Sequence, residues 1–388
     1  MRVTHSMMVN NMAYWASQQG NKLRDAQTVI GSGKQINKPS DDPLAAGQIL
    51  SDRASISQYG QYESNIVQAK TWIVVSNTTL DTISSTLQNA RDAVDLYLPG
   101  GTSTVISVGL LYDLYNQILA LANSPNASGS GYMYSGNISN TMPFAKVNID
   151  SGALPPVAPI EFDLASNATT VNIQVMNSAG TVVSNITTVG AAGLNTITTP
   201  IWDGQDDDDN DLPDGQYSFI VTASNGTPAV AVDAYPSYGG DDGGKEIFTG
   251  ANESIDLNNN GKAMFGSLLS NLSQAITIIN TISGPPPLTG AELAAEQVKL
   301  ADIGDALKGN STDLEDEQVK LFNAGVQLDG AKIRLQQLKT STSNRVSDQE
   351  MGSPEEAAIK LQIQQNNYEQ VMVVTANVLK MPKLTDYI

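Results

Sequence analysis

Acidic side chains gather in one short stretch near the middle of the chain, and their spacing could bind a cation. Asp207, Asp209 and Asp211 alternate with other residues, and Asp214 follows. Carboxylate oxygens at this spacing can converge on Ca²⁺, which is bound through several oxygen ligands. Leu212, however, stands at the sixth position of the loop, where a calcium-binding loop has glycine. The stretch therefore predicts either a calcium site or a solvated acidic turn between two strands.

The scarcity of other reactive residues excludes most kinds of catalytic chemistry. The chain has no cysteine, which excludes thiolate nucleophiles, disulfides, zinc–thiolate sites and iron–sulfur clusters. The lone His5 has no second histidine with which to share a metal, so we expect it to cap a helix or line an interface. The stretch IGSGKQ (30–35) lacks the first glycine and the hydroxyl residue of a phosphate-binding loop, and we interpret it as a helix end capped by Gly31 or Gly33. With no recognisable acid–base pair, we predict no enzyme and no cofactor other than calcium.

Composition limits the class of partner. The 388 residues can form two or three domains, and 40% hydrophobic residues are enough for real cores. A net charge of −19 argues against nucleic acid or an anionic membrane as a partner. The sequence shows neither an apolar run that would span a membrane nor a cleavable signal peptide at its N-terminus. We therefore expect a cytoplasmic protein, or one exported by a route that does not read such a signal.

A middle block differs from the rest of the chain in both charge and periodicity. No Lys or Arg occurs between Lys146 and Lys245. The block contains short β-branched runs separated by Gly, Asn and Asp, at 159–165, 171–183, 195–204 and 215–224. This pattern predicts an all-β sandwich over about 155–235, inserted between helical arms.

The flanking regions carry heptad repeats that predict long helices. On the N-terminal side, apolar and small residues recur every seven positions in two sets. These are Ile66, Ile73, Leu80, Leu87 and Val94, with Ala69, Ser76, Ile83, Ala90 and Tyr97. The C-terminal side repeats Leu314, Leu321, Leu328 and Leu335, accompanied by Ala324, Ala331 and Leu338. Neither side can bury such a seam alone, so we predict an α+β fold in which long antiparallel N- and C-terminal helices form a coiled-coil hairpin around the β insert.

The ends of the chain mix apolar residues with many amides. A Lys-Pro-Ser-Asp-Asp-Pro turn separates the first 30 or so residues from the next helix, which we expect to begin near Pro43. After a second break, the apolar spacing resumes with Ala357, Leu361, Gln364, Tyr368, Val371 and Val378. Two interpretations remain open. The terminal helices either dock as a pair on their own chain or fold only against copies of themselves in an assembly.

Several of these motifs carry a resemblance to a known family. RVTHSMM (2–8), SGKQINKPSDDPLAA (32–46), YMYSGNISNTMPF (132–144) and the tail from 346 to 380 resemble the flagellin family. The similarity is strongest to members at the junction between flagellar hook and filament, because Pro39 and Pro43 flank the Asp-Asp turn. The tail ends in MPKLTDYI, where the family has a pattern similar to Ser-Leu-Leu-Asp-Tyr-Leu.

The middle block carries a second resemblance. Residues 171–224 are similar to the immunoglobulin-like repeat of the flagellar hook-cap protein, with its Trp-Asp-Gly turn and Pro-Asp-Gly-x-Tyr hairpin. Gly204 and Gly215 would permit turns with positive φ, and Trp202, Tyr217 and Phe219 would fill the sandwich core. The resemblance implies an outward-facing module, but such a scaffold does not name a ligand.

The flagellin resemblance implies a mechanical role. It implies terminal helices in the inner layer of a tube, an adjacent coiled-coil layer, and export through the flagellar type III apparatus to the cell exterior without a cleaved signal peptide. The implied partners are identical copies in a ring, another hook-associated protein, flagellin and an export chaperone. A structural subunit joining hook to filament is favoured; bulk flagellin and a surface adhesin displayed by the β insert remain alternatives.

The expected organisation has five parts. They are an inner helix (1–40), a coiled-coil half (41–145), the β insert (146–240), a second coiled-coil half (241–353) and a terminal inner helix (354–388). The residues expected to carry assembly are Met7, Met8, Trp15, Pro39, Asp41, Asp42, Pro43, Tyr368, Val371 and Val378.

Overall fold

The structure is a computed structural model of the chain, and the residues that it describes form six helices and ten strands. It describes residues 5–99, 108–126, 129, 131–145, 148–150, 160–177, 180–197, 202, 204–213, 216–227, 229–257, 260–284 and 287–380. The helices are α1 (His5–Ser32), α2 (Pro43–Asp95), α3 (Val108–Ala122), α4 (Gly261–Ser283), α5 (Gly290–Glu350) and α6 (Pro354–Lys380). The chain divides into two compact units, one of Met1–Ser64 with Ala331–Ile388 and the other of Asn65–Gly330.

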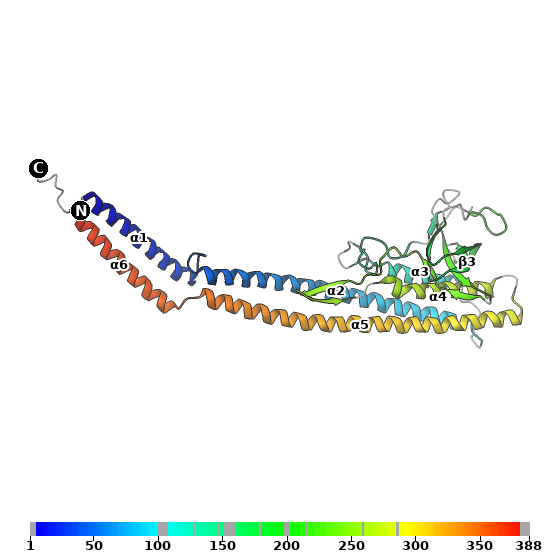
Figure 1. The fold of residues 1–388 in the computed structure, drawn as a ribbon. Helices are drawn as coiled ribbons and strands as arrows, with labels where there is room; N and C mark the ends of the chain where they lie inside the picture. The colour runs from blue at the N-terminus through cyan, green and yellow to red at the C-terminus, as the bar shows by residue number, and fades with distance from the viewer. Residues whose placement is uncertain are drawn as a thin grey trace. The chain divides into compact units, whose positions relative to one another are not determined.

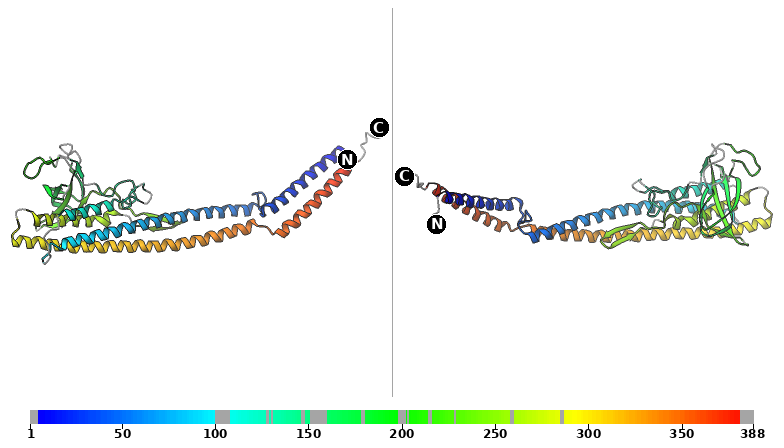
Figure 2. Two further views of the ribbon diagram at one scale, coloured as in Figure 1. Left: turned by 180° about the vertical axis from the view of Figure 1, so that it is seen from behind. Right: turned by 45° about the horizontal axis from the view of Figure 1, so that its top comes forward.

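The first unit contains the terminal helices, which run side by side (Figures 1 and 2). Their contact is close, because a side chain at Gly20 of α1 would begin 3.5 Å from the Tyr368 ring of α6. In the same unit, the start of α2 lies antiparallel to the end of α5, as the Asp52–Arg345 and Glu63–Lys339 ion pairs show. Gly47 and Gly60 of α2 have open space where a Cβ atom would stand.

The second unit buries the predicted heptad seam. Here too α2 and α5 are antiparallel, because Lys70 pairs with Asp329 and Asp81 accepts a hydrogen bond from Gln318. The buried seam residues of α2 are Ile66, Ala69, Ile73, Ser76, Leu80, Ile83, Leu87, Ala90 and Val94. Those of α5 in this unit are Leu314, Leu321, Ala324 and Leu328. Helices α3 and α4 pack on each other in this unit and add Ile118 and Leu272 to its core.

Two seam positions differ from the prediction. Tyr97 lies beyond the end of α2 and is half-buried. Leu338 is exposed, and the buried face of α5 continues instead through Thr342 and Val346. Lys339, the residue after Leu338, is half-buried and reaches Glu63 at 2.6 Å. The first seven-residue set therefore continues one heptad further, to Thr342, whereas the second set shifts by one position, from Leu338 to Lys339.

The β insert forms two antiparallel sheets in the second unit. Among the described residues, one sheet has the order β1-β6-β3-β4 with β7 beside β6, and the other has the order β5-β2-β8. The strands are β1 (Asn148–Asp150), β2 (Ile160–Leu164), β3 (Ala168–Met176), β4 (Val182–Gly190), β5 (Gly193–Ile197), β6 (Gln216–Asn225), β7 (Val230–Val232) and β8 (Ala234–Pro236). This confirms an all-β region in the middle of the chain.

The core of the insert contains the predicted aromatic residues. Trp202, Tyr217 and Phe219 are buried, and the rings of Trp202 and Tyr217 lie 4.9 Å apart. Gly204 has a φ of 85°, as the predicted turn requires, whereas Gly215 lies outside the described residues. The sequence pattern therefore predicted the core residues of this region correctly.

Hydrogen bonds attach the insert to α4. Ala234 N donates to Ser270 Oγ at 3.1 Å, and Thr277 Oγ1 donates to Gln174 Oε1 at 3.0 Å. The chain of bonds continues from Gln174 Nε2 to Asn185 Oδ1 at 3.2 Å, and from Asn185 Nδ2 to Asp207 at 2.9 Å. A chain of hydrogen bonds, buried at Gln174 and exposed at Asn185 and Asp207, thus connects a helix, two strands and the acidic loop.

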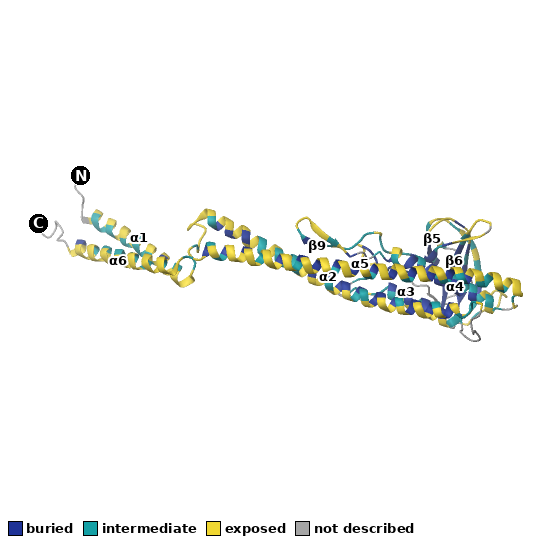
Figure 3. Ribbon diagram, turned by 90° about the horizontal axis from the view of Figure 1, so that it is seen from below, coloured by how far each residue is buried: buried dark blue, intermediate teal, exposed yellow. Residues whose placement is uncertain are grey.

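A further hairpin lies outside the predicted sandwich. Strands β9 (Glu246–Gly250) and β10 (Glu253–Asp256) pair antiparallel in a region expected to belong to the second coiled-coil half. Asn65 of α2 donates a hydrogen bond to Phe248 O at 3.3 Å. The class as a whole is α+β, with long helices and an inserted antiparallel β region, as predicted. Figure 3 shows buried residues concentrated along the second unit's helices and strands, whereas exposed residues predominate on α1 and α6.

Candidate functional site

The Pro-Ser-Asp-Asp-Pro turn begins where α1 is capped. Gly33 has a φ of 70°, and its N–H donates to Val29 O at 2.9 Å, so Gly33 is the left-handed cap. Asp41 Oδ2 then accepts hydrogen bonds from Asn37 N at 3.0 Å and Lys38 N at 2.8 Å. These backbone donors, Lys38 first and then Asn37, lower the pKa of Asp41. The carboxylate therefore holds the turn in one conformation.

Asp42 caps the helix that follows. Its Oδ1 accepts from Leu44 N and Ala45 N, both at 3.0 Å, so two free amides of the first turn of α2 are satisfied. Pro43 is the first residue of α2, as predicted, where its missing N–H costs nothing. Pro39, Asp41, Asp42 and Pro43 are all exposed. The two aspartates are therefore explained by local structure, independently of any partner.

Glu350, the last residue of α5, connects three segments. Its side chain is only 10% exposed and binds Lys34 Nζ at 2.7 Å and the Arg53 guanidinium. Gln35 N also donates to Glu350 O at 2.6 Å. The Lys34 hydrogen bond, supported by the charge of Arg53, lowers the pKa of Glu350 despite its burial. A single carboxylate thus holds the chain after α1, the start of α2 and the end of α5 together.

A second ion pair lies one turn away along the same helices. Asp52 accepts from Arg345 Nε at 2.8 Å and from Arg345 Nη2 at 2.6 Å, a bidentate arrangement. The Asp52 side chain is 7% exposed, and the Arg345 hydrogen bonds lower the pKa of its carboxyl group. Sequence reasoning found neither pair, because each joins residues far apart in the chain.

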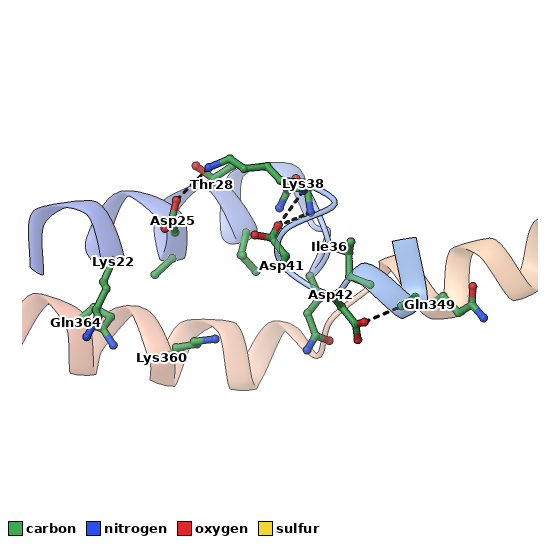
Figure 4. Close-up of a pocket in the computed structure, with 15 residues that line it drawn as sticks. Lys22, Asp25, Thr28, Ile36, Lys38, Asp41, Asp42, Gln349, Lys360 and Gln364 are labelled. Carbon is green, nitrogen blue, oxygen red and sulfur yellow. Dashed lines mark hydrogen bonds and ion pairs between the residues drawn. The ribbon is translucent and has the colours of Figure 1, made fainter. Parts of the chain in front are cut away.

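A groove of about 650 Å³ lies where these elements meet (Figure 4). Its walls are α1, the turn, and the facing parts of α5 and α6. Lys22 extends from α1 towards Gln364 of α6, and Lys38 of the turn pairs with Asp25 at 3.3 Å. The charged residues of the lining are three lysines and three aspartates, which suits contact with polar protein surface rather than an apolar ligand.

The predicted assembly residues of the terminal helices fall into two groups. Met7 and Trp15 of α1 are 56% and 52% exposed. In contrast, Met8, Tyr368 and Val371 are half-buried and Val378 is buried, on the faces by which α1 and α6 contact each other. The second group therefore packs within the terminal pair, whereas the side chains of the first group are largely exposed to solvent.

Sequence reasoning missed an apolar face on α6. Ile359, Ile363, Val373 and Val374 are 47–60% exposed, and their spacing places them on the face opposite the one that packs on α1. The signal was present as a second set of apolar residues in IKLQIQQNNYEQVMVV (359–374). Because the first set accounted for a helix–helix seam, the second set was not recognised.

The acidic loop forms internal hydrogen bonds. Asp207 accepts from both Asn185 N and Asn185 Nδ2, whereas Asp206 accepts from Asn210 N at 2.9 Å. Asp209 has a φ of 63°, as in a tight turn. Asp214 lies outside the described residues. Within the described ranges no group of three or more His, Asp or Glu side chains could hold a metal ion, so calcium binding at Asp207, Asp209, Asp211 and Asp214 stays a prediction.

No helix in the described part of the chain is both long and apolar enough to cross a membrane.

Comparisons with known proteins match two segments of the chain. Residues 3–99 match the bacterial flagellin N-terminal helical region, and residues 154–227 match the FlgD Ig-like domain. The N-terminal helical segment and the β insert are thus each similar to part of a flagellar protein.

Two curated relatives to which the chain is similar are both hook-associated proteins. Flagellar hook-associated protein 3 of Escherichia coli (strain K12) is 28% identical over 147 residues, 37% of this chain and 45% of that protein. The protein of the same name from Salmonella typhimurium is 28% identical over 149 residues, 37% of this chain and 46% of that protein. The match thus covers less than half of either relative.

The flagellar hook associated protein-3 from Legionella pneumophila has a TM-score of 0.41 and 14% identity, and covers 77% of this chain and 98% of its own. The resemblance to the flagellin family, and within it to hook-associated protein 3, is confirmed by the sequence matches. These matches favour that relative over bulk flagellin.

Proposed function

We propose that this chain is a structural subunit of the bacterial flagellum that joins hook to filament. The observation that carries the proposal is the similarity of residues 3–99 to the flagellin N-terminal helical region, together with the 147-residue match to hook-associated protein 3. A mechanical role also suits a protein whose prominent groove is lined by balanced surface charges. On this proposal the protein acts outside the cell and has no catalytic role.

The terminal helices are the parts proposed to bind neighbouring subunits. The exposed residues Met7 and Trp15 on α1, and Ile359, Ile363 and Val373 on α6, supply apolar area that a partner could cover. Each Å² removed from water contributes about 25 cal/mol, and a ring of identical copies repeats the contact. The half-buried Met8, Tyr368 and Val371, with buried Val378, would support assembly by holding α1 against α6.

The turn is proposed to position this surface. Asp41 and Asp42, flanked by Pro39 and Pro43, order the chain between α1 and α2 through four backbone hydrogen bonds. The five-part division of the chain, from 1–40 to 354–388, belongs to the same proposal. So do the remaining partners: a neighbouring hook-associated protein, flagellin, and a chaperone that accompanies the chain to a type III export apparatus.

The test is genetic complementation with a change on the exposed face of α6. The chain is expressed in its own host lacking the chromosomal copy, and hooks are inspected by electron microscopy. Val373→Asp should leave the protein in the culture medium but reduce the number of hooks that carry filaments, because a charge on this face opposes burial against a neighbour. The matched control is Gln365→Asp, which adds the same charge to an exposed polar position of α6.

Three outcomes bear on the proposal. Normal filaments with Val373→Asp would remove this face from assembly. Normal filaments without any copy of the gene would overturn the junction role altogether. Growth of the purified chain into long filaments without hook or junction partners would instead support a bulk flagellin.

A further inference from the structure

We infer that Asn225 is a site of spontaneous deamidation, which converts one exposed hairpin of the β insert into aspartate and isoaspartate forms. Asn225 is the last residue of β6, and Gly226 follows it in the turn that leads to β7. The inference does not depend on the proposed function, because the reaction needs only the chain and water.

The local geometry exposes both reacting groups. Asn225, Gly226 and Thr227 are all exposed. Gly226 has a φ of 81°, and it has no side chain to hinder approach to its nitrogen. Within the described residues, neither the Asn225 amide side chain nor Gly226 N has a hydrogen-bond partner. The pair Asn225↔Val230 is also the end of the β6–β7 ladder, where opening costs little free energy.

The chemistry is balanced without any further reactant. Gly226 N attacks Asn225 Cγ, a new N–C bond forms, and the side-chain nitrogen leaves as ammonia, giving a cyclic imide. Water then opens either C–N bond of the ring. One opening gives aspartate, and the other gives isoaspartate, whose main chain is longer by the methylene of the former side chain. Nothing is oxidised or reduced.

A second Asn-Gly pair in the same chain provides an internal contrast. Asn260 Oδ1 accepts from Ala263 N at 3.2 Å as the N-cap of α4. Gly261 N donates to Tyr134 O at 2.9 Å and lies 3.2 Å from Tyr238 Oη. Gly261 is also buried. Both the amide and the attacking nitrogen are therefore held by other groups at Asn260, whereas no described residue bonds to either group at Asn225.

The products would change the end of one sheet. By register, Asn225 lies at the same end as Thr170 of β3, Gly190 of β4 and Val230 of β7. The strand ends 168–170, 188–190, 223–225 and 230–232 carry no charged residue. Aspartate would place the first negative charge there, and isoaspartate would disturb the pairing of Ala231 and Val232 with β6.

The test is ageing of the purified full-length protein at mildly alkaline pH, followed by peptide mapping with mass spectrometry. In the folded protein, Asn225 should deamidate at least about tenfold faster than Asn260, because the cap and backbone bonds at Asn260 must open before attack. In denaturant the two sites should react at similar rates, which shows that the difference comes from the fold. An isoaspartyl methyltransferase assay should label the Asn225 peptide.

Hydrogen exchange tests the structural consequence. After ageing, the amides of Ala231 and Val232 should exchange faster in the wild-type protein but not in Asn225→Gln, whose longer side chain forms the cyclic imide far more slowly. Equal rates at Asn225 and Asn260 in the folded protein would overturn the inference. So would an aged wild-type protein in which Asn225 is unchanged while the denatured chain reacts.

Discussion

The two units of this chain use similar apolar spacing to different effect. In the Asn65–Gly330 unit, Leu80, Leu87 and Leu328 are fully buried. In the terminal pair, Tyr368 and Val371 occupy equivalent seam positions but are only half-buried. The difference arises because α3, α4 and the β insert add layers to the second unit, whereas α1 and α6 mainly contact each other. A heptad pattern therefore predicts which face is buried but not how completely.

The two units also differ in the apolar side chains that they expose. The terminal pair leaves Met7, Trp15, Ile363 and Val373 exposed on helices rich in amides. Such helices gain little from burial when alone, because the apolar area they cover barely offsets the entropy of ordering. The second unit should therefore hold most of the chain's intrinsic stability, and the following changes test that division.

The largest expected loss of stability follows from truncating a residue of the buried heptad seam of α2. Leu87→Ala should lower the free energy of unfolding by about 3 kcal/mol, because it removes a fully buried side chain and leaves a cavity. Denaturant unfolding of the purified protein measures the change. A loss as small as that of an exposed substitution such as Val74→Ala would contradict the assignment of the core to this unit.

The next effect concerns the ion cluster that orders the first unit. Glu350→Gln should lower the unfolding temperature at neutral pH, because Lys34 and Arg53 would lose their shared anion. The folded-state pKa of Glu350 lies below its ordinary value of 4.5. Its contribution is thus fully present above that pH and is lost as the pH falls through the folded-state pKa.

Thermal unfolding across a pH series checks both parts of this prediction. The difference between wild type and Glu350→Gln should shrink towards zero under acidic conditions. Glu369→Gln, at an exposed position of α6, is the control and should behave as wild type throughout. A constant difference at every pH would show that the substitution acts through packing and not through charge.

A smaller effect is expected at the cap of α2. Asp42→Ala should cost about 1 kcal/mol locally, because two backbone amides lose their acceptor. Hydrogen exchange at Leu44 and Ala45 should become faster, whereas Ser40→Ala, in the same exposed turn, should leave it unchanged. Unaltered protection in Asp42→Ala would mean that the turn does not depend on this carboxylate.

The smallest stability effect is expected in the terminal pair. Val371→Ala should lower the free energy of unfolding by less than about 1 kcal/mol, because the side chain is already half-exposed and leaves no closed cavity.

Limited proteolysis should nevertheless cut the monomer first before about Pro39 and after about Pro354. A loss as large as that of Leu87→Ala, or resistant ends, would show that the terminal helices are a stable part of the monomer.

Much of the architecture could be predicted from local patterns. The seven-residue spacing from Ile66 to Val94 predicted a buried face, and the Pro43 start of α2 followed from Pro and Asp chemistry. The β insert followed from its change of period, and the burial of Trp202 and Tyr217 from its resemblance to a known repeat. These features depend on neighbours in sequence, so one chain is enough to find them.

Other features depend on distant residues and could not be predicted in this way. The shift from Leu338 to Lys339 on α5 reflects Glu63 on another helix. The Glu350 cluster needs Lys34 and Arg53. The β9–β10 hairpin was missed because its two short strands lie after the region where the period changed. For Lys339 and Glu350 a partner far along the chain decides the local outcome, whereas the two strands of the hairpin are neighbours in sequence.

The glycines inside the helices of the first unit have a consequence for how easily those helices unwind. Gly47 and Gly60 have open space around them, and the contact between Gly20 and Tyr368 would tolerate a methyl group. None of the three is therefore required by crowding, yet each weakens its helix by roughly 1 kcal/mol relative to alanine. A polypeptide that must pass through a narrow channel as an extended strand would need less pulling work at these points.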